Sequence, residues 1–296
     1  MTTASKFGVG DKWRTQVSFW CWMIPALAIL LPMFVAPLAR LARNSFNQDD
    51  PVGMMRPTWV LDNYVTALTD PFYSAVFGNT LMVAGGVAAF CVLTAYPFAY
   101  FLVGFAGRSR KILLWCVYMP LFVSVIMRVF GWMVFIADTG IVNRLLIGTG
   151  LVDSPLHLMY EVPGMLLGIV HRYLPLAILP MINAMSKIDP LVLRASGNLG
   201  ESGVGTFARV VIPLSLPGAL AGFQLVLAGV LSDFVIPILM GSTKFRMLAP
   251  VVYEEALTNA SWALSAALAM VMLAIVAVIL VGTNLLVRYL SPWVRA

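Results

Sequence analysis

Residues 256–287 read ALTNASWALSAALAMVMLAIVAVILVGTNLLV and contain no charged side chain. A helix needs roughly 20 apolar residues to cross a hydrocarbon core of about 30 Å, because every backbone N–H and C=O must be satisfied within the segment. This stretch exceeds that length. It predicts a membrane-spanning helix, which we place at residues 262–287.

Further long apolar stretches precede it. Residues 15–39 and 71–107 contain no charge, and three others are interrupted only by isolated ionisable side chains. The predicted spans are residues 16–39, 79–104, 112–137, 162–186, 212–240 and 262–287. We therefore expect an all-α, polytopic membrane protein with six transmembrane helices.

The composition agrees with this assignment. Of 296 residues, 60% are hydrophobic and 11% are charged, and the mean hydropathy of +0.90 lies outside the range of soluble domains. The net charge of +6 is spread over short loops and forms no patch. We expect membrane lipid, and no nucleic acid, as a partner.

The loop charges predict an orientation. The segments on the N-terminal side of the membrane hold eleven basic and three acidic residues, whereas the opposite side holds six basic and nine acidic residues. The positive-inside rule places both termini in the cytoplasm. Residues 1–14 and 292–296 are then cytoplasmic tails that flank a membrane domain of residues 15–291.

Three charged side chains fall inside predicted spans, where they are functional candidates by default. Asp233 is expected either to attract a cationic group of a substrate or to pair with Arg128. Arg172 is expected to meet a carboxylate or phosphonate, or to extend its charge to a wet cavity. Three aromatic residues are expected either to line the same path by cation–π contact or simply to pack: Trp132, Tyr173 and Phe234.

The chain offers no recognisable catalytic or metal site. Cys21, Cys91 and Cys116 all fall inside predicted spans, and no His, Cys or carboxylate cluster accompanies them. Residues 200–206 read GESGVGT, but a phosphate-binding loop needs a lysine where Thr206 stands. We expect no catalytic residue, no metal and no cofactor bound by this chain.

The loop between the fourth and fifth predicted spans, residues 187–211, has a recognisable pattern. Asp189 followed by Pro190 is a helix start, and Gly200 is a natural stop. We expect a short helix at about residues 190–199. A second amphipathic turn carrying Phe207 and Arg209 should follow it.

This loop resembles the cytoplasmic loop of permease subunits in ABC importers, Glu-Ala-Ala-x3-Gly-x9-Ile-x-Leu-Pro. The residues at the matching positions are Arg194, Ala195, Ser196, Gly200, Val210, Ile212 and Pro213. Arg194 replaces the usual glutamate, and Ser196 replaces the second alanine. In the family this loop docks on the ATPase, so the resemblance assigns ATPase coupling to the following residues: Asp189, Pro190, Arg194, Ala195, Ser196, Gly200, Glu201, Phe207, Val210, Ile212 and Pro213.

The resemblance extends over residues 63–287. Residues 119–132, 138–143 and 232–241 are similar to spermidine/putrescine-type permeases. This implies the type I ABC importer fold in a bacterial inner membrane and transport by alternating access. It also implies two ATP-binding subunits holding ATP and Mg²⁺, a second permease forming a heterodimer, and a periplasmic solute-binding protein.

The implied solute is a polyamine or a similar amine. Because Arg128 and Arg172 offer partners for an anion, an opine-like, aminophosphonate or other zwitterionic or anionic solute is the alternative. A different class of protein, a stand-alone secondary transporter, would use Asp233 and His171 as a proton relay and would need no ATPase.

Overall fold

The computed structural model describes residues 9–50, 54–104 and 107–290, and it consists almost entirely of helices. The α-helices are α1 Val9–Asn44, α2 Asp62–Thr69, α3 Pro71–Gly104, α4 Arg110–Phe122, α5 Val125–Ile136, α6 Ile141–Gly148, α7 Val162–Met185, α8 Pro190–Asn198, α9 Gly203–Thr206, α10 Ile212–Leu231, α11 Val235–Met240, α12 Leu248–Leu257 and α13 Trp262–Leu290. A 3₁₀ turn at Gly107–Ser109 precedes α4, and a π-helical turn at Phe207–Val211 joins α9 to α10.

Six segments of the described chain are long and apolar enough to cross a membrane. The predicted number of spans is therefore confirmed. Each of these segments overlaps one of the six expected spans. The second begins earlier than residue 79, because Asp70 accepts a hydrogen bond from the Phe72 amide at 2.8 Å and so caps a helix that starts at Pro71.

The third and fifth spans differ from the prediction of single continuous helices. The helix expected at 112–137 is broken, because Val123 and Ser124 are extended and Pro120 removes a backbone donor just before them. The apolar segment long enough to span there is Val125–Gly148. The helix expected at 212–240 stops at Leu231 and restarts at Val235, and Asp233 lies in the gap.

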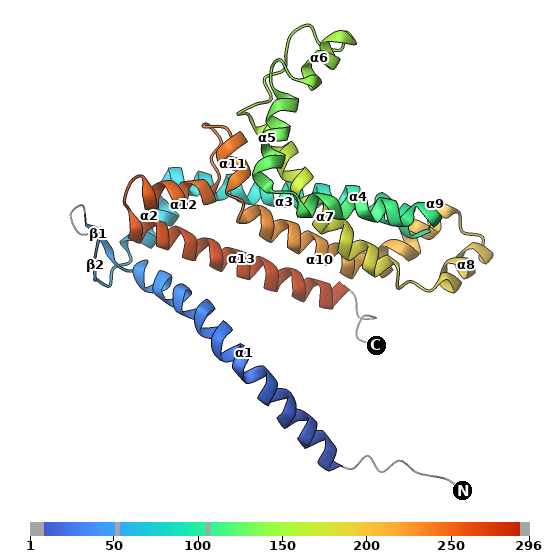
Figure 1. Cartoon of the computed structure of the whole chain (residues 1–296), viewed down its shortest axis with the longest axis horizontal. Helices are drawn as coiled ribbons and strands as arrows, with labels where there is room; N and C mark the ends of the chain where they lie inside the picture. Colours follow the sequence, from blue (N-terminus) through green and yellow to red (C-terminus); the bar gives the residue numbers. More distant parts are fainter. Residues whose placement is uncertain (1–8, 51–53, 105–106, 291–296) are drawn as a thin grey trace.

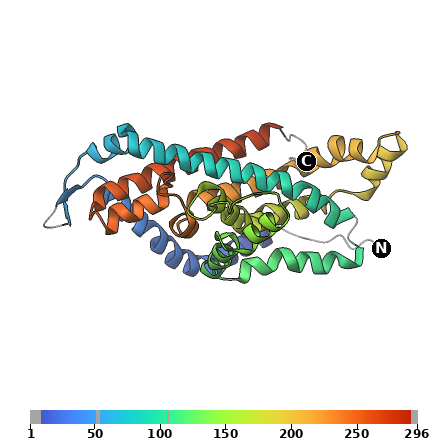
Figure 2. The same ribbon diagram turned by 90° about the horizontal axis from the view of Figure 1, so that it is seen from above.

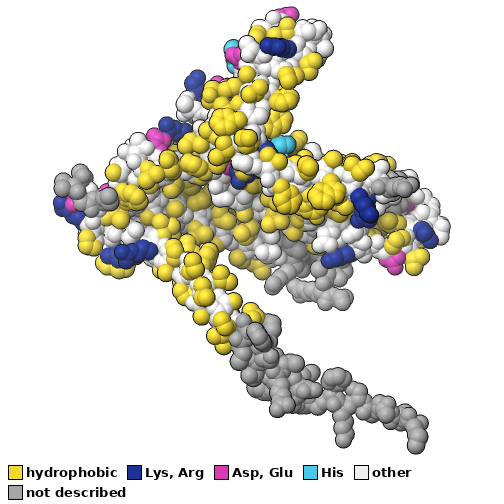
Figure 3. Space-filling view, in the orientation of Figure 1, with side chains coloured by type: hydrophobic (Ala, Val, Ile, Leu, Met, Phe, Trp, Pro, Cys, Tyr) yellow, Lys and Arg dark blue, Asp and Glu magenta, His cyan; other side chains and the backbone are white. Residues whose placement is uncertain are grey.

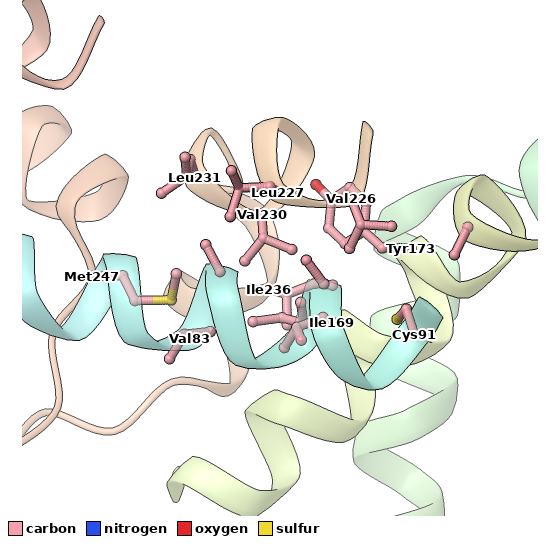
Figure 4. Packing of buried hydrophobic residues seen from close by; sticks show 14 of the residues in the cluster. Val83, Cys91, Ile169, Tyr173, Val226, Leu227, Val230, Leu231, Ile236 and Met247 are labelled. Atoms are coloured by element: carbon pink, nitrogen blue, oxygen red, sulfur yellow. The ribbon is translucent and has the colours of Figure 1, made fainter. Parts of the chain in front are cut away.

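The core of the protein is formed by α3, α7 and α10, which pack on one another (Figure 4). Small residues allow this close approach of the helix backbones. A Cβ on Gly222 would lie 2.9 Å from the Ala177 carbonyl oxygen, and one on Gly218 would lie 2.8 Å from that of Pro180. On α3, Ala84 is fully buried in the same core.

Two parts of the chain extend away from this bundle. Helix α1 runs obliquely from the bundle, and none of the apolar window of its spanning segment is buried (Figure 1). Helices α5 and α6 project sideways after the break at Ser124. Apolar side chains cover the coloured part of α1 next to the bundle and most of α5, while charged side chains appear at the tip around α6 (Figure 3).

The two ends of the bundle carry different structures (Figures 1 and 2). One end holds α8 and α9. The other holds α2, α12 and an antiparallel hairpin of β1, Gln48–Asp50, and β2, Met54–Arg56. In this hairpin, Asp49 accepts hydrogen bonds from the amides of Ala263 at 2.7 Å and Leu264 at 3.3 Å, and so caps the first turn of α13.

Candidate functional site

The segment between α7 and α10 contains the predicted short helix. Asp189 Oδ1 accepts from the Leu191 amide at 2.8 Å, and Pro190 occupies the first helical position of α8. At the other end Gly200 has a φ of +86°. The Glu201 amide donates to the Ser196 carbonyl at 3.2 Å, and the Gly200 amide donates to the Gly197 carbonyl at 3.0 Å. This pair of bonds is a Schellman motif, which fixes where α8 ends.

Polar contacts fasten α8 to the turn that follows it. Ser196 is buried, and its hydroxyl lies 3.0 Å from that of Thr206, which is also buried. Glu201 forms an ion pair with Arg209 beside this contact. The serine that departs from the family pattern therefore has a local partner in Thr206, the residue that stands where a phosphate-binding loop would have its lysine.

Phe207 connects this segment to the transmembrane core. Its ring lies 4.8 Å from that of Tyr100 and 6.3 Å from that of Tyr96, both on α3. The π-helical turn then leads directly into α10, where Ile212 and Pro213 form the first turn and are partly buried. Arg194 and Ala195 remain exposed on α8. Displacement of α8 would therefore reach α3 and α10 through short, packed contacts.

A second candidate site lies inside the bundle, where α7 meets the gap between α10 and α11. Arg172 Nη1 donates to Asp233 Oδ1 at 3.1 Å. The Asp233 side chain has no exposed surface, while that of Arg172 is 27% exposed. The expected pair of Asp233 with Arg128 is wrong, because the carboxylate meets an arginine of α7 and not the arginine of α5.

Arg128 on α5 instead lies beside this pair. Among the described residues, its buried Nε and Nη1 atoms have no hydrogen-bond partner. It lines an open groove of about 230 Å³ together with Gly131, Trp132, Phe135 and His171. Trp132 packs edge-on against His171, with ring centroids 5.5 Å apart. The groove thus places aromatic side chains beside an arginine side chain.

The remaining two aromatic candidates have structural contacts. Tyr173 is buried, and its hydroxyl donates to the Gly229 carbonyl at 2.7 Å, which ties α7 to α10. Phe234 packs on Tyr253 of α12 at 4.9 Å. The structure therefore brings Arg128, Trp132 and the Arg172 pair together. The Arg172 guanidinium also lies 5.2 Å from the centre of the Tyr173 ring, whereas Phe234 packs on α12.

A comparison with family models identifies the chain. The family described as "Binding-protein-dependent transport system inner membrane component" matches residues 92–296, more than half of the sequence. The chain belongs to this family. It is a multi-pass inner-membrane permease of an ABC importer, as the loop pattern predicts.

Individual relatives cover most of the chain. The chain is 31% identical over 246 residues to the spermidine/putrescine transport system permease protein PotB of Escherichia coli (strain K12), covering 83% of this chain and 89% of that one. It is 23% identical over 258 residues to a putative 2-aminoethylphosphonate transport system permease protein, PhnU, of Salmonella choleraesuis (strain SC-B67), covering 84% and 86%.

A solved structure shows the same fold. The chain matches a subunit in the crystal structure of a bacterial ABC transporter involved in the import of the acidic polysaccharide alginate, with a TM-score of 0.78 and 17% identity. The match covers 95% of this chain and 98% of that one. The expected permease fold is therefore confirmed.

Proposed function

We propose that this chain forms, with a second permease, the transmembrane path for a small organic amine, and that α8 receives the movement of an ATPase. The observation that carries the proposal is the rigid connection from α8 to the core. Asp189 and Gly200 define the ends of the helix, and Phe207 joins the following turn to α3. A helix held in this way transmits displacement as a unit.

The energy source in this proposal is a separate pair of chains. ATP and Mg²⁺ would be bound by two ATP-binding subunits, because residues 200–206 lack the lysine of a phosphate-binding loop. The exposed coupling residues of α8, among them Arg194 and Ala195, would contact those subunits. With Arg194 in place of the usual glutamate, the docking surface on the ATPase should carry a complementary acidic group.

A periplasmic binding protein would deliver the solute to the opposite end of the bundle. Nucleotide-driven closure of the ATPase subunits would then move α8 and open the path outward, in the alternating access that the resemblance implies. The second permease would form a heterodimer with this chain. Helix α1 and the projecting α5 offer apolar surface for contacts with lipid and with that partner.

Two solute classes fit the proposal for different reasons. The name of the E. coli relative supports a polyamine. The second candidate, a zwitterionic amine such as an opine-like compound or an aminophosphonate, is supported by the Arg172–Asp233 pair, because Arg172 neutralises the carboxylate that would attract a second ammonium group.

Co-purification and ATPase assays test the proposal. The tagged chain, expressed with the genes that surround its own, should retain an ATPase and a second permease through gel filtration in detergent. Addition of the neighbouring binding protein should stimulate ATP hydrolysis by the complex. Purification of the chain without either partner, together with solute uptake by that preparation, would contradict the proposal and favour a stand-alone secondary transporter.

A further inference from the structure

We propose that helix α2 lies in the boundary between the lipid headgroups and the acyl chains, with an apolar face of Trp59, Leu61, Val65 and Leu68 in contact with lipid. The partner is the bilayer itself, at the end of the bundle that also holds α12 and the β-hairpin (Figure 1). The inference goes beyond the proposed function, because neither the coupling segment nor the groove includes this surface.

The apolar face of α2 is a stripe at helical spacing. Leu61, Val65 and Leu68 recur at intervals of four and three residues, so they fall on one side of the helix Asp62–Thr69 and its N-cap. Together with Trp59 they are 55% to 75% exposed. Single exposed apolar side chains are common on proteins, whereas a set of them on one face marks a surface with a partner.

The opposite side of α2 is fastened to the protein. Ala67 is fully buried, and α2 packs on α13 and α3. Asn63 Nδ2 donates to the carbonyl oxygens of Ser45 at 3.0 Å and Asn47 at 2.7 Å. The Tyr64 hydroxyl lies 2.6 Å from that of Ser45. These bonds hold α2 in one orientation, so the apolar face stays turned away from the bundle.

A third side of α2 is polar. Asp62 and Thr69 are exposed and lie roughly a quarter of a turn around the helix from the apolar stripe. A helix at the junction of protein, acyl chains and water needs three such sides, one for each surrounding. The order of residues in α2 meets this requirement within two turns of helix.

The position of α2 in the chain places it at the membrane boundary. The segment that contains α2 connects two spanning segments, Met23–Asn44 and Pro71–Gly104. Only Asp70 separates the end of α2 from the second of these. Because both spans must leave the hydrocarbon on the same side of the membrane, α2 lies next to that boundary, within reach of the acyl chains.

The residues beside α2 suit the headgroup region. Arg43 in the last turn of α1 places its guanidinium 4.2 Å from the centre of the Trp59 ring. Tryptophan is enriched at the membrane interface, and a long basic side chain near a helix end can reach the lipid phosphates. Arg40, which is also exposed, adds a second positive charge near this end of α1. These charges complement phosphate groups above an apolar stripe.

Spin labelling of the assembled importer in phosphatidylethanolamine/phosphatidylglycerol nanodiscs tests the inference, in a chain whose native cysteines are replaced. Labels are placed singly at Val65→Cys and Leu68→Cys on the apolar face, and at Thr69→Cys as the matched control on the polar face. The collision rate with oxygen, relative to a water-soluble nickel chelate, should be several-fold higher at Val65 and Leu68 than at Thr69. The two labels should lie about 5 to 10 Å inside the headgroup boundary.

Preferential collision with the nickel chelate at Val65 and Leu68 would place this face in water and overturn the inference. Exclusion of both reagents would also overturn it, because the second permease would then cover the face. Loss of the oxygen preference on addition of the binding protein would assign the face to that protein instead. None of these measurements requires ATP hydrolysis, so they remain decisive even if the proposed function fails.

Discussion

Arg172 on α7 donates a hydrogen bond through Nη1 to Oδ1 of Asp233 over 3.1 Å, in the gap where α10 stops and α11 begins. The pair joins two segments that are 61 residues apart in the chain. It holds the interrupted fifth span against the fourth at the level of the groove, so it affects both the stability of the bundle and the charge that a solute would meet.

Substitution of either partner of this pair should lower thermal stability, and the loss should be larger when Arg172 is replaced than when Asp233 is replaced. Arg172→Gln leaves the Asp233 carboxylate unpaired and without exposed surface. The free energy of unfolding should therefore fall by roughly 3 kcal/mol, the loss typical of a broken buried ion pair. Asp233→Asn should cost less, because the partly exposed Arg172 can extend toward water.

The double variant Arg172→Gln/Asp233→Asn should recover much of the stability lost in Arg172→Gln, since neither charge is left alone. Thermal unfolding in nanodiscs measures all three variants, with Arg209→Gln at the exposed Glu201 pair as a control. Additive effects of the two single changes would show that the residues are not energetically coupled.

Gly200, whose backbone has a left-handed conformation, should be required to couple ATP hydrolysis to transport. Gly200→Ala places a side chain at a φ of +86° and should destabilise the end of α8 by about 1 kcal/mol. Gly200→Pro also removes the amide that donates to Gly197 and should reduce transport per ATP hydrolysed more severely. Deletion of residues 190–199 should abolish coupling while the chain remains inserted.

Gly197→Ala is the matched control for these changes. This glycine lies within α8 and has open space around it, so an alanine should be tolerated or slightly stabilising. The readout is the ratio of solute imported to ATP hydrolysed in proteoliposomes. A normal ratio in Gly200→Pro would show that the end of α8 plays no part in coupling.

Phe207→Ala should weaken the link between the coupling segment and α3. The change removes ring contacts with Tyr96 and Tyr100, and such aromatic pairs contribute about 0.5 to 1.5 kcal/mol beyond their buried area. ATP hydrolysis should become less dependent on the binding protein. Phe122→Ala, at a side chain that is 82% exposed, should leave the dependence unchanged. An equal response of the two variants would remove Phe207 from the coupling path.

Asp49→Ala should destabilise the N-terminal end of α13. The carboxylate satisfies the Ala263 and Leu264 amides, and loss of a helix cap costs about 1 kcal/mol. Asp49→Asn retains one acceptor and should cost less. Hydrogen exchange at the start of α13 measures the effect, with the exposed Asp153→Ala as the control. Unchanged protection in Asp49→Ala would contradict the capping role.

Local signals explain what the sequence could predict. Asp189 before Pro190 and the stop at Gly200 predicted α8, because capping and left-handed conformations depend on neighbouring residues alone. Asp70 before Pro71 is the same signal at the start of α3. The helix therefore begins before residue 79, the predicted start of this span.

The features that the sequence could not predict depend on distant partners. Residues 212–240 form an apolar run that favours one continuous helix. The interruption at Asp233 is explained by its pairing with Arg172, which lies on another helix. Asp49 caps a helix whose first residues lie 214 positions further along the chain. The three-residue strand that holds Asp49 is too short to show an alternation of polar and apolar residues. For the candidate site, the ionisable residues could be identified from their depth in the membrane, but which arginine takes the carboxylate is decided by packing.

Uptake into proteoliposomes tests the central claim that this chain is a permease subunit of an ATP-driven importer. The complete complex, supplied with its solute-loaded binding protein, should import solute only when ATP is present on the side of α8, and a non-hydrolysable nucleotide should prevent turnover. Import by this chain without ATPase subunits, driven by a proton gradient alone, would contradict the account.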